Sequence, residues 1–437
     1  MVFVFDSIIL GKLQSKADQR VTFILHSLQE IDQNLQNYDS SLVVRFGDPT
    51  TEIPRLASQL DAQAVVTARD IEPYAVARDE RVRKSLVVQG IEFQTVKDQV
   101  IFEKCEILSK TGTPFRVFTP FSRAWLDRFE PSQDARLFKP DLSRLVSKAI
   151  CSSHSIVLTH EAISFESTEL WLVPGERAAR KALDNFEQKI DQYGAARDFP
   201  AINGTSFLSA HLRFGTISVR EAVRAACRHG SDGSRKWLTE LIWREFYQYL
   251  LANNPHVVSQ PFKEGCREMQ WPGLDEHFDA WKRGVTGYPI IDAAMRCFAA
   301  TGWMHNRLRM IVASFLTKDL LIDYRHGEAY FASNLLDFDL ASNNGGWQWA
   351  ASVGCDSQPY FRIFNPYLQS QKFDQDGAFI RQWIPELAVL DNQAIHRPSP
   401  IDAECCGYPK PIVDHGIQRK LAIAMFRQSK KSPNHTS

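Results

Sequence analysis

Residues 335–352 read LLDFDLASNNGGWQWAAS, and this stretch is unlike the core of an ordinary helix. Two Asn, two Gly and two Trp fall within the seven residues 343–349. The glycines allow another group to approach the backbone closely. Asp337 and Asp339 could pair with Arg309 or accept a hydrogen bond from a ring N–H, and no usual metal-ligand spacing fits them. The stretch therefore indicates a binding site for something bulky.

The chain around this stretch has a helical pattern from about residue 186 onward. Apolar residues recur three and four positions apart, as on one face of a helix, and eight of the ten Trp lie at or beyond position 237. We therefore expect an all-α region. Its expected helices cover 206–213, 218–229, 235–253, 274–283, 288–301, 305–322, 326–336 and 339–352.

The first hundred residues have a different pattern, in which short β-rich runs alternate with amphipathic stretches. Apolar strands separated by helices are typical of βαβ units with a parallel sheet. Asp48 and Pro49 mark the start of one helix as its cap and first residue, and Gly90 marks the end of another. The expected strands are 2–6, 42–46, 64–68 and 91–96, with helices at 18–37, 50–60 and 74–89.

These patterns predict two domains and a long linker. We expect an α/β domain with a doubly wound parallel sheet at residues 1–125, a linker at 126–185 and a large all-α domain at 186–437.

Composition excludes several classes of protein. The chain has 437 residues, with 51 Lys and Arg against 51 Asp and Glu, so its formal charge is zero. A hydrophobic fraction of 44% supplies a core and excludes a disordered chain. No apolar run approaches the roughly 18 residues of a membrane span. Because there is no global positive field, any DNA binding needs a local basic patch.

The eight cysteines form no CxxC motif, and no His pair has zinc spacing, so we expect no metal site. A chain of this length does not need disulfides. The N-terminus, MVFVFDSIIL, lacks the basic and small residues of a signal peptide. We therefore expect reduced thiols and a cytoplasmic protein without a membrane anchor.

Residues 234–250, SRKWLTELIWREFYQYL, combine aromatic and charged side chains on one expected helix face. One interpretation is an ordinary amphipathic helix with an ion pair between Glu240 and Arg244. The other is an acid beside two stacking rings, which suits a flat heterocycle. The side chains that share this face are Trp237, Glu240, Trp243, Arg244 and Tyr247.

Two further segments each allow two interpretations. Residues 302–310 place two Arg, an Asn and a His in one apolar helix, either as a structural salt-bridge cluster or as a polar site. Residues 205–209, TSFLS, precede a helix, where hydroxyls and backbone N–H groups either bind an anion or simply cap the helix.

These segments belong to long blocks that resemble the photolyase/cryptochrome family, nearest to its class I branch, which repairs cyclobutane pyrimidine dimers. The resemblance covers essentially the whole helical region, and the N-terminal segment with VFVFD and DIEPY resembles the family's antenna domain. The blocks are ELIWREF (240–246), TGYPIIDAAMR (286–296), TGWMHNRLRM (301–310), LLDFDLASNNGGWQWAAS (335–352) and PYFRIFNP (359–366).

The resemblance implies that the helical domain binds FAD in a folded conformation, with the reduced form FADH⁻ active. Residues 205–209 would lie on its phosphates and Asn343 at flavin N5. Plant-type cryptochromes have Asp at that place, so Asn343 points to repair. The implied cofactor contacts are Tyr193, Thr205, Ser206, Phe207, Leu208, Ser209, Trp237, Arg244, Arg309, Asp337, Phe338, Asp339 and Asn343.

The implied substrate is a cyclobutane pyrimidine dimer that leaves the DNA duplex and enters a pocket. Trp243 and Trp349 would form its stacking walls, and Glu240 would hydrogen-bond its carbonyl and stabilise the transferred electron. Enzymes for the (6-4) photoproduct have a second His where this chain has Asn306, which argues against that substrate. The implied substrate and DNA contacts are Glu240, Trp243, Asn306, Arg307, Met310, Trp349 and Arg197.

Photoreduction in the family uses three Trp, and here Trp347 and Trp271 match the inner and outer positions. Tyr324 stands at the middle position, so we expect slow photoreduction that Tyr324→Trp would speed. The family's first strand and an Arg-Arg-Asp-Leu-Arg-like segment are expected upstream of VFVFD, so we expect an N-terminally incomplete antenna domain.

The expected partner is UV-damaged DNA, single- or double-stranded, bound by a cytoplasmic monomer that associates with the nucleoid. DIEPY slightly favours 8-hydroxy-5-deazaflavin over methenyltetrahydrofolate as an antenna, and no antenna residues are identified. Two other hypotheses remain: a non-repairing flavin blue-light receptor of the cryptochrome type, and a remnant that binds flavin without activity. The residues Glu240, Trp243, Asn343 and Trp349 together favour the enzyme.

Overall fold

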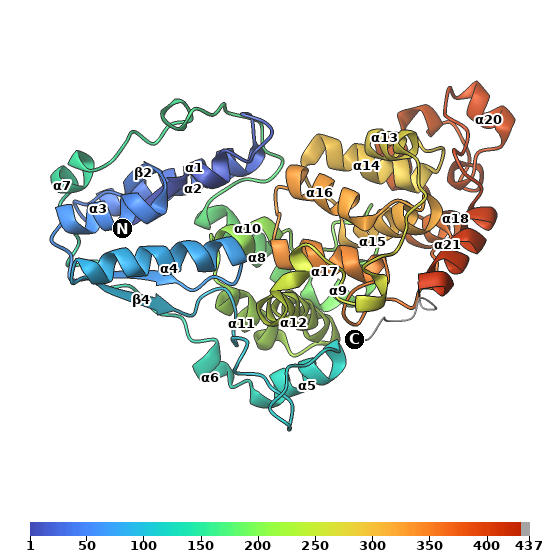
Figure 1. The fold of residues 1–437 in the computed structure, drawn as a ribbon. Coiled ribbons are helices and arrows are strands. Elements are labelled where there is room, and N and C mark those ends of the chain that lie inside the picture. The colour runs from blue at the N-terminus through green and yellow to red at the C-terminus, as the bar shows by residue number, and fades with distance from the viewer. Residues whose placement is uncertain (430–437) are drawn as a thin grey trace. The chain divides into compact units, whose positions relative to one another are not determined.

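The computed structural model describes residues 1–429, whose contacts divide the chain into two compact units (Figure 1). The first unit comprises residues 1–113, 123–188 and 206–252. The second comprises residues 114–122, 189–205 and those from 253 onward. Each unit is thus assembled from three separate stretches of chain. The predicted domain boundaries at 125 and 185 stay a prediction.

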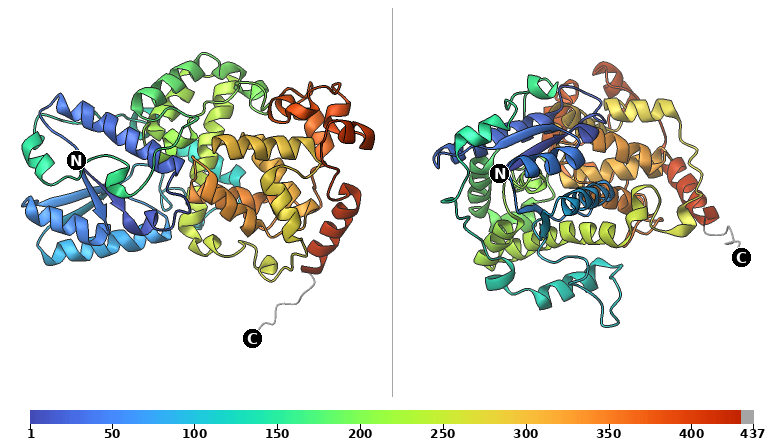
Figure 2. Two further views of the ribbon diagram at one scale, coloured as in Figure 1. Left: turned by 90° about the horizontal axis from the view of Figure 1, so that it is seen from above. Right: turned by 60° about the vertical axis from the view of Figure 1, so that its left-hand side comes forward.

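The first unit contains four strands, all parallel, which confirms the predicted α/β fold class. Strand β1 (Val2–Asp6) pairs with β2 (Val43–Gly47), and β3 (Ala64–Ala68) pairs with β4 (Glu92–Val96). Within the described residues these form two sheets of two strands rather than one continuous sheet. Every strand therefore has an edge without a strand partner. Figure 2 shows these blue elements from two further sides.

Local signals explain where the first helices begin and end. The Asp48 side chain accepts a hydrogen bond from the Thr50 N–H at 2.9 Å, and Pro49 is the first residue of α3, as predicted. The C-cap of α4 is Gln89, one residue before the predicted Gly90, which has a φ of +73°. These helices are α1 (Ser7–Leu10), α2 (Gln19–Gln36), α3 (Pro49–Gln59) and α4 (Pro73–Val88).

The segment predicted as a linker contains short helices and lies along strand β2. The Ile156 N–H donates to the Val44 carbonyl at 2.9 Å, and the Val44 N–H donates to the Ser155 hydroxyl at 2.9 Å. The helices from here to residue 253 are α5 (Phe118–Arg128), α6 (Pro131–Asp134), α7 (Lys148–Ser153), η1 (Glu161–Ile163), α8 (Glu176–Glu187), η2 (Ile190–Gln192), α9 (Tyr193–Ala196), α10 (Ser209–Phe214), α11 (Val219–His229) and α12 (Asp232–Asn253).

The part of the second unit beyond residue 253 is helical, as predicted, and its core surrounds α14. The predicted helix 305–322 is present but ends earlier, because α15 continues from Ser314 directly into a π-helical turn, η5, that ends at Asp319. The elements are η3 (Pro255–Val258), η4 (Glu264–Cys266), α13 (Asp275–Arg283), α14 (Pro289–Thr301), α15 (Asn306–Ser314), η5 (Phe315–Asp319), α16 (Tyr324–Asn334), α17 (Leu340–Ala350), α18 (Pro366–Phe373), α19 (Ala378–Trp383), η6 (Pro385–Leu387), η7 (Ala394–His396), α20 (Pro400–Cys405) and α21 (His415–Ser429).

Candidate active site

The expected site residues are divided between the two units. The first unit carries Ser206, Phe207, Leu208, Ser209, Trp237, Glu240, Trp243 and Arg244. The second carries Tyr193, Arg197, Thr205, Trp271, Asn306, Arg307, Arg309, Met310, Tyr324, Asp337, Phe338, Asp339, Asn343, Trp347 and Trp349.

Helix α12 carries the acid and the aromatic rings on one face, as its spacing predicts. Glu240, Trp243, Arg244 and Tyr247 are all half-buried. The rings of Trp243 and Tyr247 lie 5.6 Å apart. Trp237 is buried, and its ring lies 4.8 Å from the ring of Phe186 on α8. A half-buried carboxyl next to a half-buried indole is suited to contact a planar polar ligand.

Arg244 and Glu245 are adjacent on α12 but contact different kinds of group. The Arg244 guanidinium donates to the carbonyl oxygens of Gln99 at 2.8 Å and Leu212 at 3.5 Å. Glu245 is completely buried and accepts hydrogen bonds from backbone and indole N–H groups. Burial raises the pKa of Glu245 to about 7, and the donated hydrogen bonds oppose that rise. The sequence analysis missed Glu245, although one acid among buried apolar positions was a usable signal.

The segment 205–209 contains a buried hydroxyl that lacks a partner. The Thr205 Oγ1 atom is buried and has no hydrogen-bond partner among residues 1–429. Phe207 has a φ of +54°, a left-handed conformation that costs energy for a non-glycine residue. Leu208 is buried and Ser209 begins α10. A buried hydroxyl normally has a partner, so this atom fits a site where a polar ligand supplies one.

Arg309 and Asp337 form an ion pair in the second unit, as one of the sequence interpretations predicts. Both carboxylate oxygens of Asp337 accept from Arg309 Nη2, at 3.0 and 2.8 Å, and Arg309 Nε donates to the Met304 carbonyl at 2.7 Å. Asp337 is buried and Phe338 packs against the core. Asp339 instead caps α17, accepting from the Ser342 N–H at 2.7 Å.

Asn343 is held from α16 by its amide. Its Nδ2 donates to the Glu328 backbone carbonyl at 3.1 Å, while Nδ2 of Asn344 donates to the Glu328 carboxyl at 2.9 Å. Gln348 continues this network, accepting from the Phe262 N–H at 2.8 Å. Burial raises the pKa of Glu328 to about 7. The glycine-rich stretch is therefore a regular helix, and its Asn side-chain amides donate hydrogen bonds to adjacent segments. Glu328 and Gln348 belong to this hydrogen-bond network, and the sequence analysis missed both.

The basic residues of this unit gather around Asp198 and Phe373. Arg307 donates to Asp198 at 2.8 Å, Arg197 lies 3.8 Å from it, and Arg307 and Lys372 both lie over the ring of Phe373. Asn306 is exposed. Asn306 and Arg307 both contact the Met310 sulfur at 3.9 Å, and Tyr193 packs under Arg197.

The three expected electron-transfer residues differ in exposure. Trp347 and Tyr324 are buried in the same core cluster, and Trp271 packs partly buried against it. The ring of Trp271 lies 6.1 Å from that of Phe426 on α21. Burial, together with Glu328 and Asp323, raises the pKa of the Tyr324 phenol. Trp349 is half-buried on the same helix as Trp347.

Comparison with known proteins gives consistent matches over most of the chain. Residues 1–140 match the DNA photolyase domain, and residues 237–428 match the FAD binding domain of DNA photolyase. A deoxyribodipyrimidine photo-lyase of Vibrio cholerae is 41% identical over 93% of this chain and 89% of its own length.

Two solved structures are similar as well. A class III photolyase from Agrobacterium tumefaciens has a TM-score of 0.86 and 34% identity, covering 99% of this chain and 92% of that one. A photolyase from Sulfolobus tokodaii, described with two FAD molecules, has a TM-score of 0.82 and 33% identity over 98% of this chain and 92% of that one. This chain therefore belongs to the photolyase/cryptochrome family, and residues 237–428 form that family's FAD-binding domain.

Proposed function

We propose that this protein is a deoxyribodipyrimidine photo-lyase, which uses light and reduced FAD to split cyclobutane pyrimidine dimers in DNA. Three relatives with this name are 40–41% identical to this chain over most of its length, which supports the proposal. The observation that carries it is the face of α12, where the half-buried Glu240 lies next to Trp243 on the helix surface. An acid beside an indole fits a pyrimidine, which has both a flat ring and carbonyl oxygens.

The residues of this chain have two kinds of role in the proposal. Bound reduced FAD would supply the electron that starts dimer splitting when light excites it. Thr205, the Arg309–Asp337 pair and Asn343 would hold the cofactor, and the unpartnered Thr205 hydroxyl supports a polar ligand there. We assign the other expected cofactor contacts to the same task.

The substrate would be held by stacking and by hydrogen bonds. Trp243 and Trp349 would stack on the flipped-out dimer, and Glu240 would hydrogen-bond a dimer carbonyl, which stabilises the added negative charge. Asn306 and Met310 would contact the dimer as well. The cluster of Arg197, Arg307 and Lys372 supports phosphate binding, since arginine guanidinium groups match phosphate geometry.

The finer points of binding and location are proposals too. We infer a monomer that acts on single- or double-stranded damaged DNA in the cytoplasm, at the nucleoid. Across residues 1–429, no helix has the length and apolar character that crossing a membrane requires. An antenna, with 8-hydroxy-5-deazaflavin slightly favoured over methenyltetrahydrofolate, and a Trp347–Tyr324–Trp271 electron path complete the proposal.

The test is repair of a thymine-dimer oligonucleotide by chemically reduced protein under blue light, with a dark control. Chemical reduction makes the assay independent of Tyr324. Light-dependent loss of dimers is expected, and Glu240→Gln should retain flavin while losing much of the repair rate. Flavin-loaded wild-type protein that repairs nothing would favour a blue-light receptor or an inactive remnant instead.

A further inference from the structure

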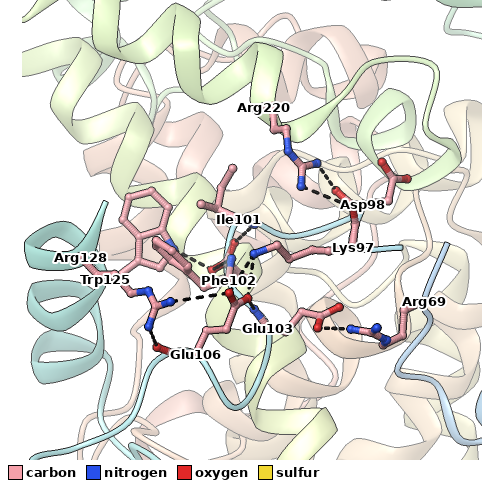
Figure 3. Close-up of polar contacts among 11 residues, drawn as sticks. Arg69, Lys97, Asp98, Ile101, Phe102, Glu103, Glu106, Trp125, Arg128 and Arg220 are labelled. Atoms are coloured by element: carbon pink, nitrogen blue, oxygen red, sulfur yellow. Dashed lines mark hydrogen bonds and ion pairs between the residues drawn. The ribbon is translucent and has the colours of Figure 1, made fainter. Parts of the chain in front are cut away.

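The loop after strand β4 is held by side chains of helices α11 and α12 rather than by secondary structure (Figure 3). Arg220 donates to the carbonyl oxygens of Lys97 at 3.4 Å and Asp98 at 2.9 Å. Arg244 donates to the next carbonyl, that of Gln99, at 2.8 Å. We call residues 97–102 the clamped loop. Three successive carbonyl oxygens of this loop thus accept hydrogen bonds from arginine side chains of α11 and α12.

Glu245 binds the other end of the clamped loop. One carboxylate oxygen accepts from the Ile101 N–H at 2.6 Å, and the other accepts from the Phe102 N–H at 3.0 Å. The second oxygen also accepts from the indole N–H of Trp125 on α5 at 2.7 Å. Glu245 is 3% exposed, so water cannot replace these bonds. Loss of the carboxylate would leave three buried donors without an acceptor.

Residues that follow the clamped loop in the chain also contact it. Lys97 Nζ lies 2.8 Å from the Glu106 carboxylate, which also accepts from the Glu103 N–H at 2.7 Å. Arg128 on α5 donates to the Glu106 carbonyl at 2.6 Å and lies 5.1 Å from the ring of Phe102. The hydrogen bonds and ion pairs among these contacts are marked in Figure 3, and together with the ring contact they fix the path of the loop.

We propose that Glu245 is a positioning residue for the flavin site, which acts by fixing the clamped loop so that the Gln99 carbonyl orients the Arg244 guanidinium. The inference rests on the proposed function, in which Arg244 contacts FAD. Arg244 bridges two backbone carbonyls, Gln99 O on the loop and Leu212 O on α10. A released loop removes the bond to Gln99, the shorter of these two, and so weakens the restraint on the orientation of the long arginine side chain.

The experiment compares Glu245→Gln with a matched control, Asp292→Asn. Asp292 is likewise a completely buried carboxylate that accepts from backbone N–H groups, at Thr286 and Gly287, and it lies in the second unit. Both changes replace a buried carboxyl group by an amide of nearly the same size. The measurements are the dissociation constant of FAD for the apoprotein, the visible circular dichroism of the bound flavin, and amide hydrogen exchange of residues 97–102.

Glu245→Gln should accelerate exchange of the Ile101 and Phe102 amides, weaken FAD binding by about tenfold, and change the flavin circular dichroism. At an equal loss of thermal stability, Asp292→Asn should change FAD affinity by less than about twofold. Faster loop exchange with unchanged FAD affinity and dichroism would overturn the proposal and leave Glu245 a structural role only. Equal losses of FAD affinity in both variants would overturn it as well.

A milder variant covers the case in which Glu245→Gln does not fold. Trp125→Phe removes only the indole donor and leaves the two backbone bonds, so its FAD affinity should fall relative to wild type, by less than about tenfold. An unchanged FAD affinity with faster loop exchange would again overturn the proposal. Wild-type protein that binds FAD but repairs no dimer would refute the proposed function while leaving the Glu245 comparison intact. Wild-type protein that binds no FAD would overturn both.

Discussion

The indole ring of Trp347 on α17 lies so close to Gly327 on α16 that a carbon atom added at Gly327 would overlap the ring. Gly327 is therefore required by close packing, because its φ is in the ordinary range. The contact fixes the distance between the two helices at the place where α17 also presents Asn343. The contact also fixes the ring of Trp347 relative to α16. Tyr324 lies three residues before Gly327 on that helix, so the same contact constrains where Trp347 and Tyr324 lie relative to each other.

Gly327→Ala should destabilise the protein by about 1–3 kcal/mol, because the added methyl group forces the two helices apart. Gly346→Ala is the matched control, since a carbon added there meets nothing within 4 Å. Replacing this half-buried helix glycine by alanine should be neutral or stabilising by up to about 1 kcal/mol, because the added methyl group meets open space. Urea unfolding measures the stability of both variants. Equal midpoints for Gly327→Ala and wild type would contradict the packing argument.

Tyr324→Trp should speed photoreduction of the flavin by an external reductant under blue light. Oxidation of a tyrosine is easier when its phenol loses the proton, and burial raises the pKa of this phenol. Tryptophan does not need to lose a proton at this step. Absorbance of the flavin during illumination gives the rate, and Tyr324→Phe, which removes the phenol, should be slower than wild type. A Trp variant no faster than wild type would refute the assigned path.

The local elements could be predicted from the sequence because local signals determine them. The four strands begin and end within one residue of the predicted limits, and Asp48 and Pro49 begin α3 as expected. The change from α-helix to π-helix after Ser314 was not predictable, since the apolar pattern continues through the π-helical turn. The division of the strands into two sheets depends on which strands pair, which a single sequence does not specify.

The candidate site was predictable where charge and spacing combine, and not where partners come from distant segments. The Arg309–Asp337 pair joins two polar residues that already stood out in apolar surroundings. Glu245, in contrast, has partners more than 100 residues earlier in the chain, two on a loop without any recognisable pattern and one, Trp125, on α5. The roles of the site residues toward flavin and DNA stay predictions.

Asn343→Asp should lower the fraction of flavin that stays fully reduced and with it the repair rate. The Asn343 amide donates to the Glu328 carbonyl at 3.1 Å, and a carboxylate cannot donate that bond. If the flavin binds at Asn343 as proposed, the negative charge of the aspartate would also disfavour the anionic reduced form. A redox titration followed by absorbance measures the change, with Asn344→Asp as the neighbouring control. An unchanged titration curve would contradict the placement of Asn343 at the flavin.

Stability should depend on pH through Glu245, and the sign follows from its raised pKa. The value rises from 4.5 to about 7 in the folded chain, chiefly because the carboxyl is buried. Between these pH values the folded protein keeps a proton that the unfolded chain has released. The free energy of unfolding therefore falls as pH rises through this window, by an amount on the order of 3 kcal/mol.

Glu245→Gln isolates this contribution, because other buried acids such as Asp292, Asp319 and Glu328 have raised pKa values too and add a slope of the same sign. Arg244, the adjacent residue on α12, is the charged group that acts on the Glu245 carboxyl and lowers its pKa, and other charged side chains nearby include Lys97, Asp98, Glu103, Glu106, Arg128 and Arg220. Urea unfolding at pH 5 and pH 8 should show a smaller loss of stability for Glu245→Gln than for wild type. Parallel losses in the two proteins would mean that Glu245 remains ionised in the folded state, with its three N–H donors outweighing the effect of burial.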